Sequence, residues 1–131
     1  MKIPENLKEC YLELDNIIDK TEDGKEYLQM FLQLNEEKAI VNAHHNLGQW
    51  IRNNWELWTG DSNLCKWFNS NQIQHPDDMS SIILTSYHRY KHNKEIKLEE
   101  QLEHYIMYWL DDKEKEKRIR KNKLNEIKNI T

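Results

Sequence analysis

The spacing of apolar residues predicts helices along most of the chain. After Pro4, which suits the first position of a helix, apolar residues recur at intervals of three or four: Leu7, Tyr11, Leu14 and Ile18. The polar run 21–24 breaks this pattern, and Thr21 is a candidate N-cap for a second helix. That second helix carries an apolar stripe of its own: Tyr27, Met30, Phe31 and Leu34.

A third helix is predicted from about residue 36 to residue 57, after Asn35 and two glutamates that suit the positive end of a helix dipole. Its apolar residues share one arc of the helical wheel, and His44 and Arg52 lie at the borders of that arc. Gly48 lies inside this predicted helix at a cost of about 1 kcal/mol relative to alanine. This cost indicates that another helix or a ligand approaches closely there.

The second half of the chain continues the helical pattern. A short apolar segment at 64–68 follows the turn 59–62, and His75-Pro76 followed by two aspartates is typical of a helix start. The helix that starts there ends near residues 92–94. A last apolar stripe then follows, made of Leu98, Leu102, Tyr105, Ile106 and Trp109. Beyond Leu110 the pattern weakens, and no alternation typical of strands is present.

These patterns together predict an all-α fold. We expect one compact domain of about five or six short helices over residues 1–110, since each apolar stripe must bury itself against the others. Residues 111–131 are predicted to be a charged tail that is helical or frayed.

The composition agrees with a folded protein. Thirteen of the 131 residues are aromatic, which separates the chain from disordered proteins although 32% of its residues are charged. No apolar run is long enough to span a membrane, and the first residues lack the apolar core of a secretory signal. Cys10 and Cys65 do not form the pattern of a disulfide framework or a zinc site. We therefore expect a cytoplasmic protein with free thiols and no membrane association.

Charge is unevenly distributed along the chain. The net charge is −4 overall, −5 over residues 1–38 and +3 over residues 111–131. An acidic chain lacks the electrostatic footprint of a duplex DNA binder, so no duplex DNA partner is expected. One hypothesis for the lysine-rich tail is that it contacts nucleic acid or an acidic partner. Alternating lysine and glutamate is, however, more typical of a solvated helix or a frayed end. Exposed apolar residues on short helices are compatible with a homodimer.

Two blocks of sequence carry a resemblance to a known family. They are HHNLGQWIRNNWELW at residues 44–58 and HPDDMSSIIL at residues 75–84. With the opening residues 3–10, they resemble small bacterial and phage proteins catalogued as a domain of unknown function, over roughly residues 3–109. His45 and Glu56 depart from the family's usual aromatic residue and glycine. The resemblance implies one compact domain and transfers no catalytic residue, and the family's distribution implies an accessory role such as countering host defence.

The best candidate for a binding site centres on Arg52, with Trp55 and Trp58 close by. A guanidinium suits a phosphate or carboxylate, and an indole can stack on a planar ring. These groups predict a site for a small anionic, nucleotide-like ligand. The full predicted ligand-binding set is His44, Arg52, Trp55, Trp58, Asp77 and Asp78. In the alternative, which aromatic residues at helical spacing favour, both tryptophans are core and Arg52 pairs internally with one of the two aspartates.

Other groupings predict no metal, cofactor or catalytic site. Helix capping explains Pro76, Asp77 and Asp78, and two adjacent acids supply too few oxygens for a hard cation. His88 and His92 have a spacing that can ligate zinc, but no third ligand lies nearby. His88 points away from the apolar stripe, so both histidines are predicted at the surface. Cys65 is predicted to be a buried thiol.

The function predicted is that of a non-enzymatic helical binding module. It engages a partner protein or sequesters a small anionic, nucleotide-like ligand. The alternative is an enzyme acting on a nucleotide or another phosphate ester, with His44 or His75 as the acid–base group and Arg52 as the anion clamp. A third hypothesis is a toxin-neutralising or assembly protein whose acidic N-terminal half meets a basic partner. The enzyme requires two polar groups that converge on one cavity, which a structure can test.

Overall fold

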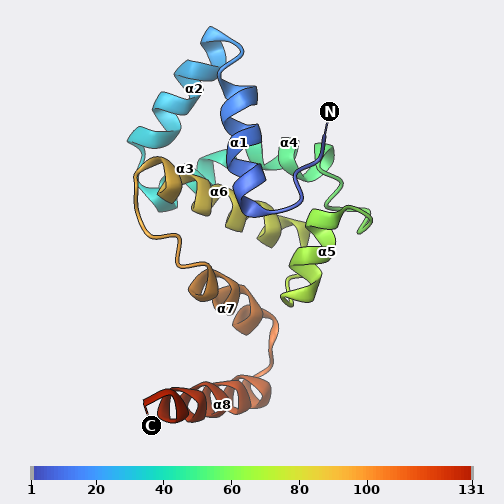
Figure 1. Ribbon diagram of the computed structural model, residues 1–131, viewed down its shortest axis with the longest axis vertical. Helices are drawn as coiled ribbons and strands as arrows, with labels where there is room; N and C mark the ends of the chain where they lie inside the picture. The colour runs from blue at the N-terminus through green and yellow to red at the C-terminus, as the bar shows by residue number, and fades with distance from the viewer. Residues whose placement is uncertain (1, 131) are drawn as a thin grey trace.

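The computed structural model describes residues 2–130, and in this range every regular element is an α-helix (Figure 1). The helices are α1 (Leu7–Ile18), α2 (Glu22–Gln33), α3 (Glu36–Ala43), α4 (Leu47–Asn54), α5 (Asn63–Ser70), α6 (Pro76–Lys91), α7 (Leu98–Trp109) and α8 (Asp112–Ile130). The all-α prediction is confirmed, but the described residues form eight helices rather than five or six. The extra helices come from a break at residues 44–46 and from the charged tail, which is a continuous helix.

The segment predicted as one helix from 36 to 57 is divided at Asn46. The backbone of Asn46 leaves the helical region (φ −123°, ψ −89°). The side-chain oxygen of Asn46 accepts hydrogen bonds from the Leu47 N–H at 2.6 Å and from the Tyr27 hydroxyl at 2.8 Å. An asparagine that satisfies the first N–H of a new helix competes with continuation of the old one. Consequently Arg52, on α4, and His44, beyond the end of α3, do not share one helix face.

Helix α6 lies at the centre of the fold and packs against α1, α2, α3, α4 and α7 (Figure 1). Most of its circumference is buried, and the buried residues are mostly apolar or small: Pro76, Met79, Ser80, Ile82, Ile83, Leu84, Ser86, Tyr87 and His88. The predicted surface position of His88 is therefore wrong: it is 3% exposed, and its Nε2 donates to the Leu34 carbonyl oxygen at 3.0 Å. Burial lowers the pKa of His88. His92, one turn later, is exposed as predicted.

The first helix begins at Leu7, with Asn6 as its N-cap, rather than at Pro4, but three later predicted helix starts are confirmed by their caps. The Thr21 hydroxyl accepts from the Gly24 N–H at 2.9 Å, and the Asn35 side chain accepts from the Lys38 N–H at 2.9 Å. Pro76 occupies the first turn of α6, directly after the N-cap residue His75. These caps satisfy N–H groups that otherwise have no partner at a helix start, and they fix where each helix begins.

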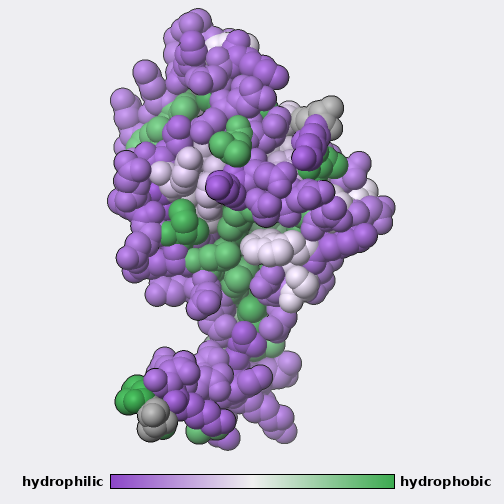
Figure 2. Space-filling view, viewed as in Figure 1, coloured by the Kyte–Doolittle hydropathy of each residue, from purple (hydrophilic) through white to green (hydrophobic). Residues whose placement is uncertain are grey.

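Helices α7 and α8 extend the molecule away from the α1–α6 body (Figure 1). Helix α7 packs on α6, whereas α8 contains no buried residue and lies at the far end of the long axis from the α1–α2 turn. The Arg118 guanidinium donates to both carboxylate oxygens of Glu103 on α7, at 2.6 and 2.8 Å. The face in Figure 2 is mostly hydrophilic, and this includes most of α8. Within residues 2–130, no helix is long and apolar enough to cross a membrane.

Candidate ligand-binding cleft

The Arg52 guanidinium points into the protein. The residue is 5% exposed, and its Nη1 donates to the Ser80 hydroxyl at 2.9 Å while its Nη2 donates to the His44 carbonyl oxygen at 2.8 Å. Its Nε lies 3.4 Å from a carboxylate oxygen of Asp77. Helix α4 and the first turns of α6 are thus joined by one side chain. The His44 ring contributes at longer range, with Nδ1 3.5 Å from Arg52 Nη1.

The two tryptophans of the predicted site lie in different environments. Trp55 is fully buried, packs edge-on against Trp50 at 5.9 Å between ring centroids, and has no hydrogen-bond partner for its Nε1 among the described residues. Trp58 is 57% exposed. Only Trp58 therefore presents a ring to solvent, where a ligand can stack on it.

The two adjacent aspartates serve separate contacts. Asp77 lies between Arg52 and His75, with 3.9 Å separating its second carboxylate oxygen from the His75 Nδ1. Asp78 accepts a hydrogen bond from the Trp109 indole N–H on α7 at 2.8 Å. In residues 2–130 no three acidic, histidine or cysteine side chains are placed to hold a metal ion. The aspartates position the start of α6 and the end of α7.

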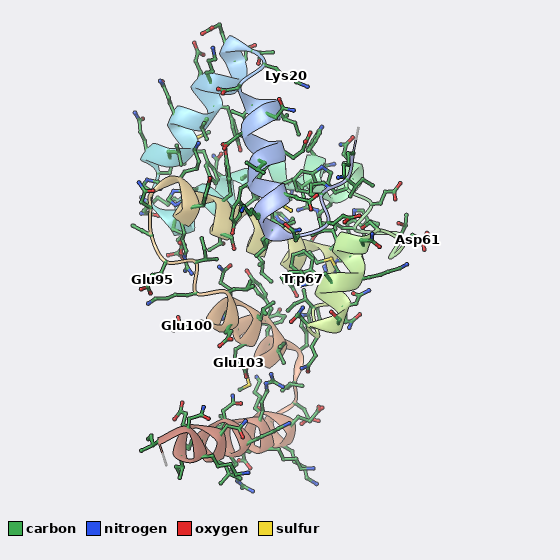
Figure 3. All side chains as sticks on the ribbon, viewed as in Figure 1. Lys20, Asp61, Trp67, Glu95, Glu100 and Glu103 are labelled. Atoms are coloured by element: carbon green, nitrogen blue, oxygen red, sulfur yellow. The ribbon has the colours of Figure 1, made fainter. Side chains whose placement is uncertain are left out.

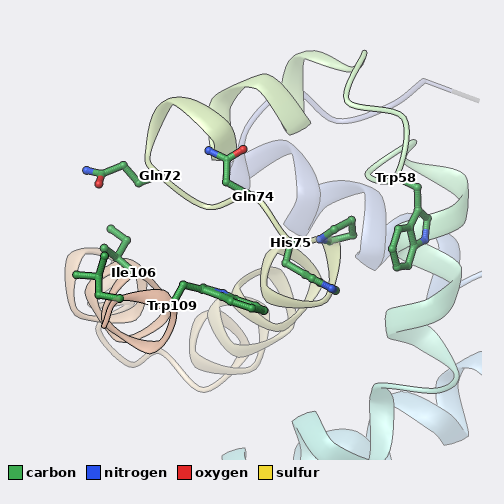
Figure 4. Close-up of a pocket in the computed structure, with 8 residues that line it drawn as sticks. Trp58, Gln72, Gln74, His75, Ile106 and Trp109 are labelled. Carbon is green, nitrogen blue, oxygen red and sulfur yellow. The ribbon is translucent and has the colours of Figure 1, made fainter. Parts of the chain in front are cut away.

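Trp58, His75 and Trp109 form one row of rings along a surface cleft (Figure 4). The His75 and Trp109 rings stack with centroids 5.9 Å apart and planes 11° apart, and Trp58 meets His75 edge-on at 6.1 Å. The cleft has a volume of about 410 Å³ and is lined by Trp58, Gln72, Gln74, His75, Pro76, Ile106, Trp109 and Leu110. Trp109 is 61% exposed, so two indoles border the cleft.

Local hydrogen bonds to the backbone position two polar residues of this cleft, His75 and Gln72. The His75 Nδ1 accepts from the Asp77 N–H at 3.0 Å, which leaves the Nε2 edge to carry the ring proton when His75 is neutral. Helix α5 ends in a Schellman motif: the Ile73 N–H donates to the Phe68 carbonyl at 2.9 Å and the Gln72 N–H donates to the Asn69 carbonyl at 3.0 Å.

Gln72 occupies the left-handed position of that motif (φ 66°), where glycine is the usual residue. A side chain that a glycine would lack is therefore kept at the edge of the cleft. Residues held in such sparsely populated backbone conformations cluster at functional sites, which supports a functional role for this edge of the cleft.

Sequence reasoning missed the α7 wall. Trp109 was assigned to the buried stripe of the last helix, yet it is mostly exposed, while Ile106 one turn earlier is buried. The paired aromatic residues Tyr108 and Trp109 at the end of a helix were the available signal, because a helix cannot bury two consecutive rings on one face. Gln72 and Gln74 carried no comparable signal.

Fold and cleft together define an all-helical protein in which an aromatic cleft lies beside the contact between the α1–α6 body and α7. The chain belongs to the family described as a domain of unknown function, DUF6794, whose model matches residues 3–91. The match ends with the last residue of α6. No curated protein and no solved structure matches the chain. One wall of the cleft, from Trp58 to Pro76, thus lies within the family domain, and the α7 wall lies beyond it.

Proposed function

We propose that this protein is a non-enzymatic helical binding module that holds a flat ring, such as the base of a small nucleotide-like ligand, in the cleft between Trp58 and Trp109. The observation that carries this proposal is the row of exposed and partly exposed rings along a cavity of about 410 Å³. Small-molecule sites have volumes of roughly 300–1,000 Å³ and are mostly apolar, with a few polar groups that orient the ligand.

The lining supplies both kinds of group. The indole faces of Trp58 and Trp109 offer stacking area, and Ile106 and Leu110 extend the apolar floor. Gln72 and Gln74 offer amides, each of which can donate to and accept from the edge of a base. This combination favours recognition of the ring over recognition of the phosphate.

The residues that line the cleft do not include Arg52, which the sequence predicts as the clamp for an anionic group of the ligand. The Arg52 guanidinium is directed to His44, Asp77 and Ser80, and Arg52 does not line the cleft. The enzymatic alternative loses support for the same reason, because His44 and Arg52 do not converge with His75 on this cavity. We therefore expect the ring to supply most of the binding free energy.

Isothermal titration calorimetry with adenosine, AMP and inorganic phosphate tests the proposal. Adenosine and AMP bind with similar affinity, and phosphate alone does not bind. Trp58→Ala lowers the affinity for both by about 5- to 150-fold, since loss of one stacking ring costs about 1–3 kcal/mol. Val41→Ala, which removes part of another exposed apolar side chain on α3, leaves the affinity unchanged. Absence of binding by adenosine and AMP, or unchanged affinity in Trp58→Ala, overturns the proposal.

A second candidate function, engagement of a partner protein, is favoured by one further observation. Tyr108 is 69% exposed beside Trp109, and tyrosine and tryptophan are enriched among the residues that dominate protein interfaces. Tyr108 does not line the cleft. Tyr108→Ala therefore leaves adenosine binding unchanged, whereas it weakens a protein contact that extends over the end of α7.

A further inference from the structure

One face of α8 carries positive charges and no acidic residue. Lys113, Lys117, Arg120 and Lys121 lie with Leu124 within an arc of about 100° on a helix that turns 100° per residue. We call these five residues the basic stripe. The four acidic residues of α8 lie on its other sides: Asp112, Glu114, Glu116 and Glu126. The sequence alternates lysine and glutamate, but the helix places the acidic residues outside this arc, with Glu114 and Glu116 at its two borders.

The basic stripe faces away from the rest of the protein. Arg118 and Asn122, which contact Glu103 on α7, lie on another side of α8. All five residues of the stripe are exposed. Figure 3 shows side chains of α8 reaching into open space on the side opposite to α7, where Glu103 is labelled. The stripe therefore forms a free surface at one end of the molecule.

The charges on the stripe are only weakly compensated within the chain. Arg120 lies 3.7 Å from Glu116, an exposed pair one turn apart. Exposed pairs of this kind contribute about 0.3–0.5 kcal/mol and are screened by salt. Among residues 2–130, no carboxylate forms an ion pair with Lys113, Lys117 or Lys121. A polyanion can neutralise these charges without displacing an internal partner.

We propose that the basic stripe binds the phosphodiester backbone of a single-stranded nucleic acid. Lysines four residues apart on a helix are spaced by about 6 Å, so the stripe presents a regular row of cations. A nucleic acid supplies a comparably dense row of anions and gains free energy from released counterions. Tyr108 and Trp109, both exposed, lie on α7 a few residues before α8 in the sequence, so the chain carries both exposed aromatic rings and a basic surface, the two kinds of group that proteins use to bind unpaired bases and their backbone.

Two other occupants fit less well. The acidic face of α1 and α2 on a second copy has several carboxylates already paired: Glu9 with Lys2, Asp15 with Lys91 and Glu22 with Lys25. A membrane surface favours helices with a broad apolar face that includes tryptophan or phenylalanine, and the stripe holds only Leu124. The acidic α1–α2 turn of the same chain lies at the opposite end of the molecule (Figure 1).

Fluorescence anisotropy with a labelled 20-nucleotide single-stranded RNA tests this proposal and does not depend on the cleft. The pair Lys117→Ala and Lys121→Ala removes two cations of the stripe. The matched control, Lys115→Ala with Lys123→Ala, removes the same charge from other sides of α8. Loss of two phosphate contacts reduces the slope of log affinity against log salt by about 1.4 and lowers affinity about 25-fold at 0.1 M salt. The control pair retains more than half of the wild-type affinity, and its slope of log affinity against log salt stays close to that of the wild type.

Each other outcome overturns the proposal. These outcomes are no binding at 50 mM salt, equal losses in the two variant pairs, and stronger binding to a duplex of the same length. Binding of the stripe to vesicles containing phosphatidylserine, with no binding to RNA, assigns the surface to a membrane instead. Salt-sensitive self-association in sedimentation velocity, abolished by the stripe variant, assigns it to a second copy. Circular dichroism of both variants confirms that α8 remains helical, as alanine favours.

Discussion

Arg52 stabilises the fold by joining α4 to the start of α6. Removal of its side chain leaves the buried Ser80 hydroxyl and the His44 carbonyl without their donor. We predict that Arg52→Ala lowers the free energy of unfolding by about 2–4 kcal/mol, because breaking a buried ion pair costs about 3–5 kcal/mol and Asp77 is partly solvated. Urea denaturation measures this change, with Ser80→Ala as a milder control that costs about 1 kcal/mol.

The same variant separates two roles for Arg52. If Arg52→Ala keeps full stability and loses adenosine or AMP binding, Arg52 contacts the ligand and the internal role is wrong. The sequence alone left these roles open, since a guanidinium at the border of an apolar arc fits both. In the structure the internal contacts of the guanidinium come from His44, just beyond α3, and from Asp77 and Ser80 on α6, which lie far from Arg52 in sequence and favour the internal role.

Trp55 and Trp58 show the limit of prediction at the scale of single residues. Three positions apart, they were assigned to one site, but α4 ends at Asn54 and the chain changes direction there. Trp55 has non-helical backbone angles (φ −99°, ψ 15°) and turns into the core, whereas Trp58 follows the left-handed Glu56 (φ 55°) and faces solvent. Periodicity holds only while the helix continues.

At the scale of helices, Arg89 connects three segments. Its Nε and Nη2 donate to the Glu36 carboxylate at 2.6 and 3.1 Å, and its Nη1 donates to the Ile96 carbonyl oxygen at 2.6 Å. The start of α3, the end of α6 and the connection to α7 thus meet at one guanidinium. The bidentate contact with Arg89 lowers the pKa of Glu36.

We predict that this pair contributes to stability at neutral pH and that the contribution disappears in acid. A carboxylate with a lowered pKa in the folded protein is stabilising above its unfolded pKa, about 4.3, and the benefit is lost as pH falls through the folded pKa. Glu36→Gln lowers stability at pH 7 and makes the free energy of unfolding depend less on pH between about 4.5 and 3. Urea denaturation at a series of pH values measures this slope. An unchanged slope contradicts the role of the pair. Glu37→Gln, the exposed neighbour, is the control.

Helix starts and stops were predictable to different degrees. Starts carried local chemistry that survives in the fold, such as Thr21, Asn35 and Pro76, because a cap satisfies N–H groups regardless of what packs nearby. The α3–α4 break was not predictable, since the Asn46 cap is supported by the Tyr27 hydroxyl from α2. The burial of His88 depended similarly on the α2–α3 connection. Local signals define elements, and tertiary contacts decide where they break and which sides they bury.

For the whole molecule, the fold class followed from the absence of strand-like alternation, while the cleft did not follow from sequence. Its two walls come from residues 58–76 and 106–110, and the adjacent rings of Tyr108 and Trp109 indicate only that one of them is exposed, not that α7 packs across the start of α6. The contact that fixes them, Trp109 to Asp78, joins residues 31 positions apart. A site built between segments is visible only once their packing is known.

The separate character of α8 leads to a prediction for the intact chain. Because α8 buries no residue and is held to α7 chiefly by the partly buried, bidentate contact of Arg118 with Glu103, ending the chain after Asp111 lowers the free energy of unfolding of the remaining domain by only about 1–2 kcal/mol, between the values for an exposed ion pair and a charged hydrogen bond. The far-UV circular dichroism spectrum loses the helical signal of α8, while the urea midpoint stays near that of the full chain.

A chain that ends after Ile96 is the contrasting variant. It loses α7, which buries Ile106 and Gln101 against α6, and we expect it to be destabilised by several kcal/mol (about 2–5 for a buried aliphatic side chain alone). A large stability loss in the first variant would show that residues 111–131 belong to the domain, contrary to the division at residue 110.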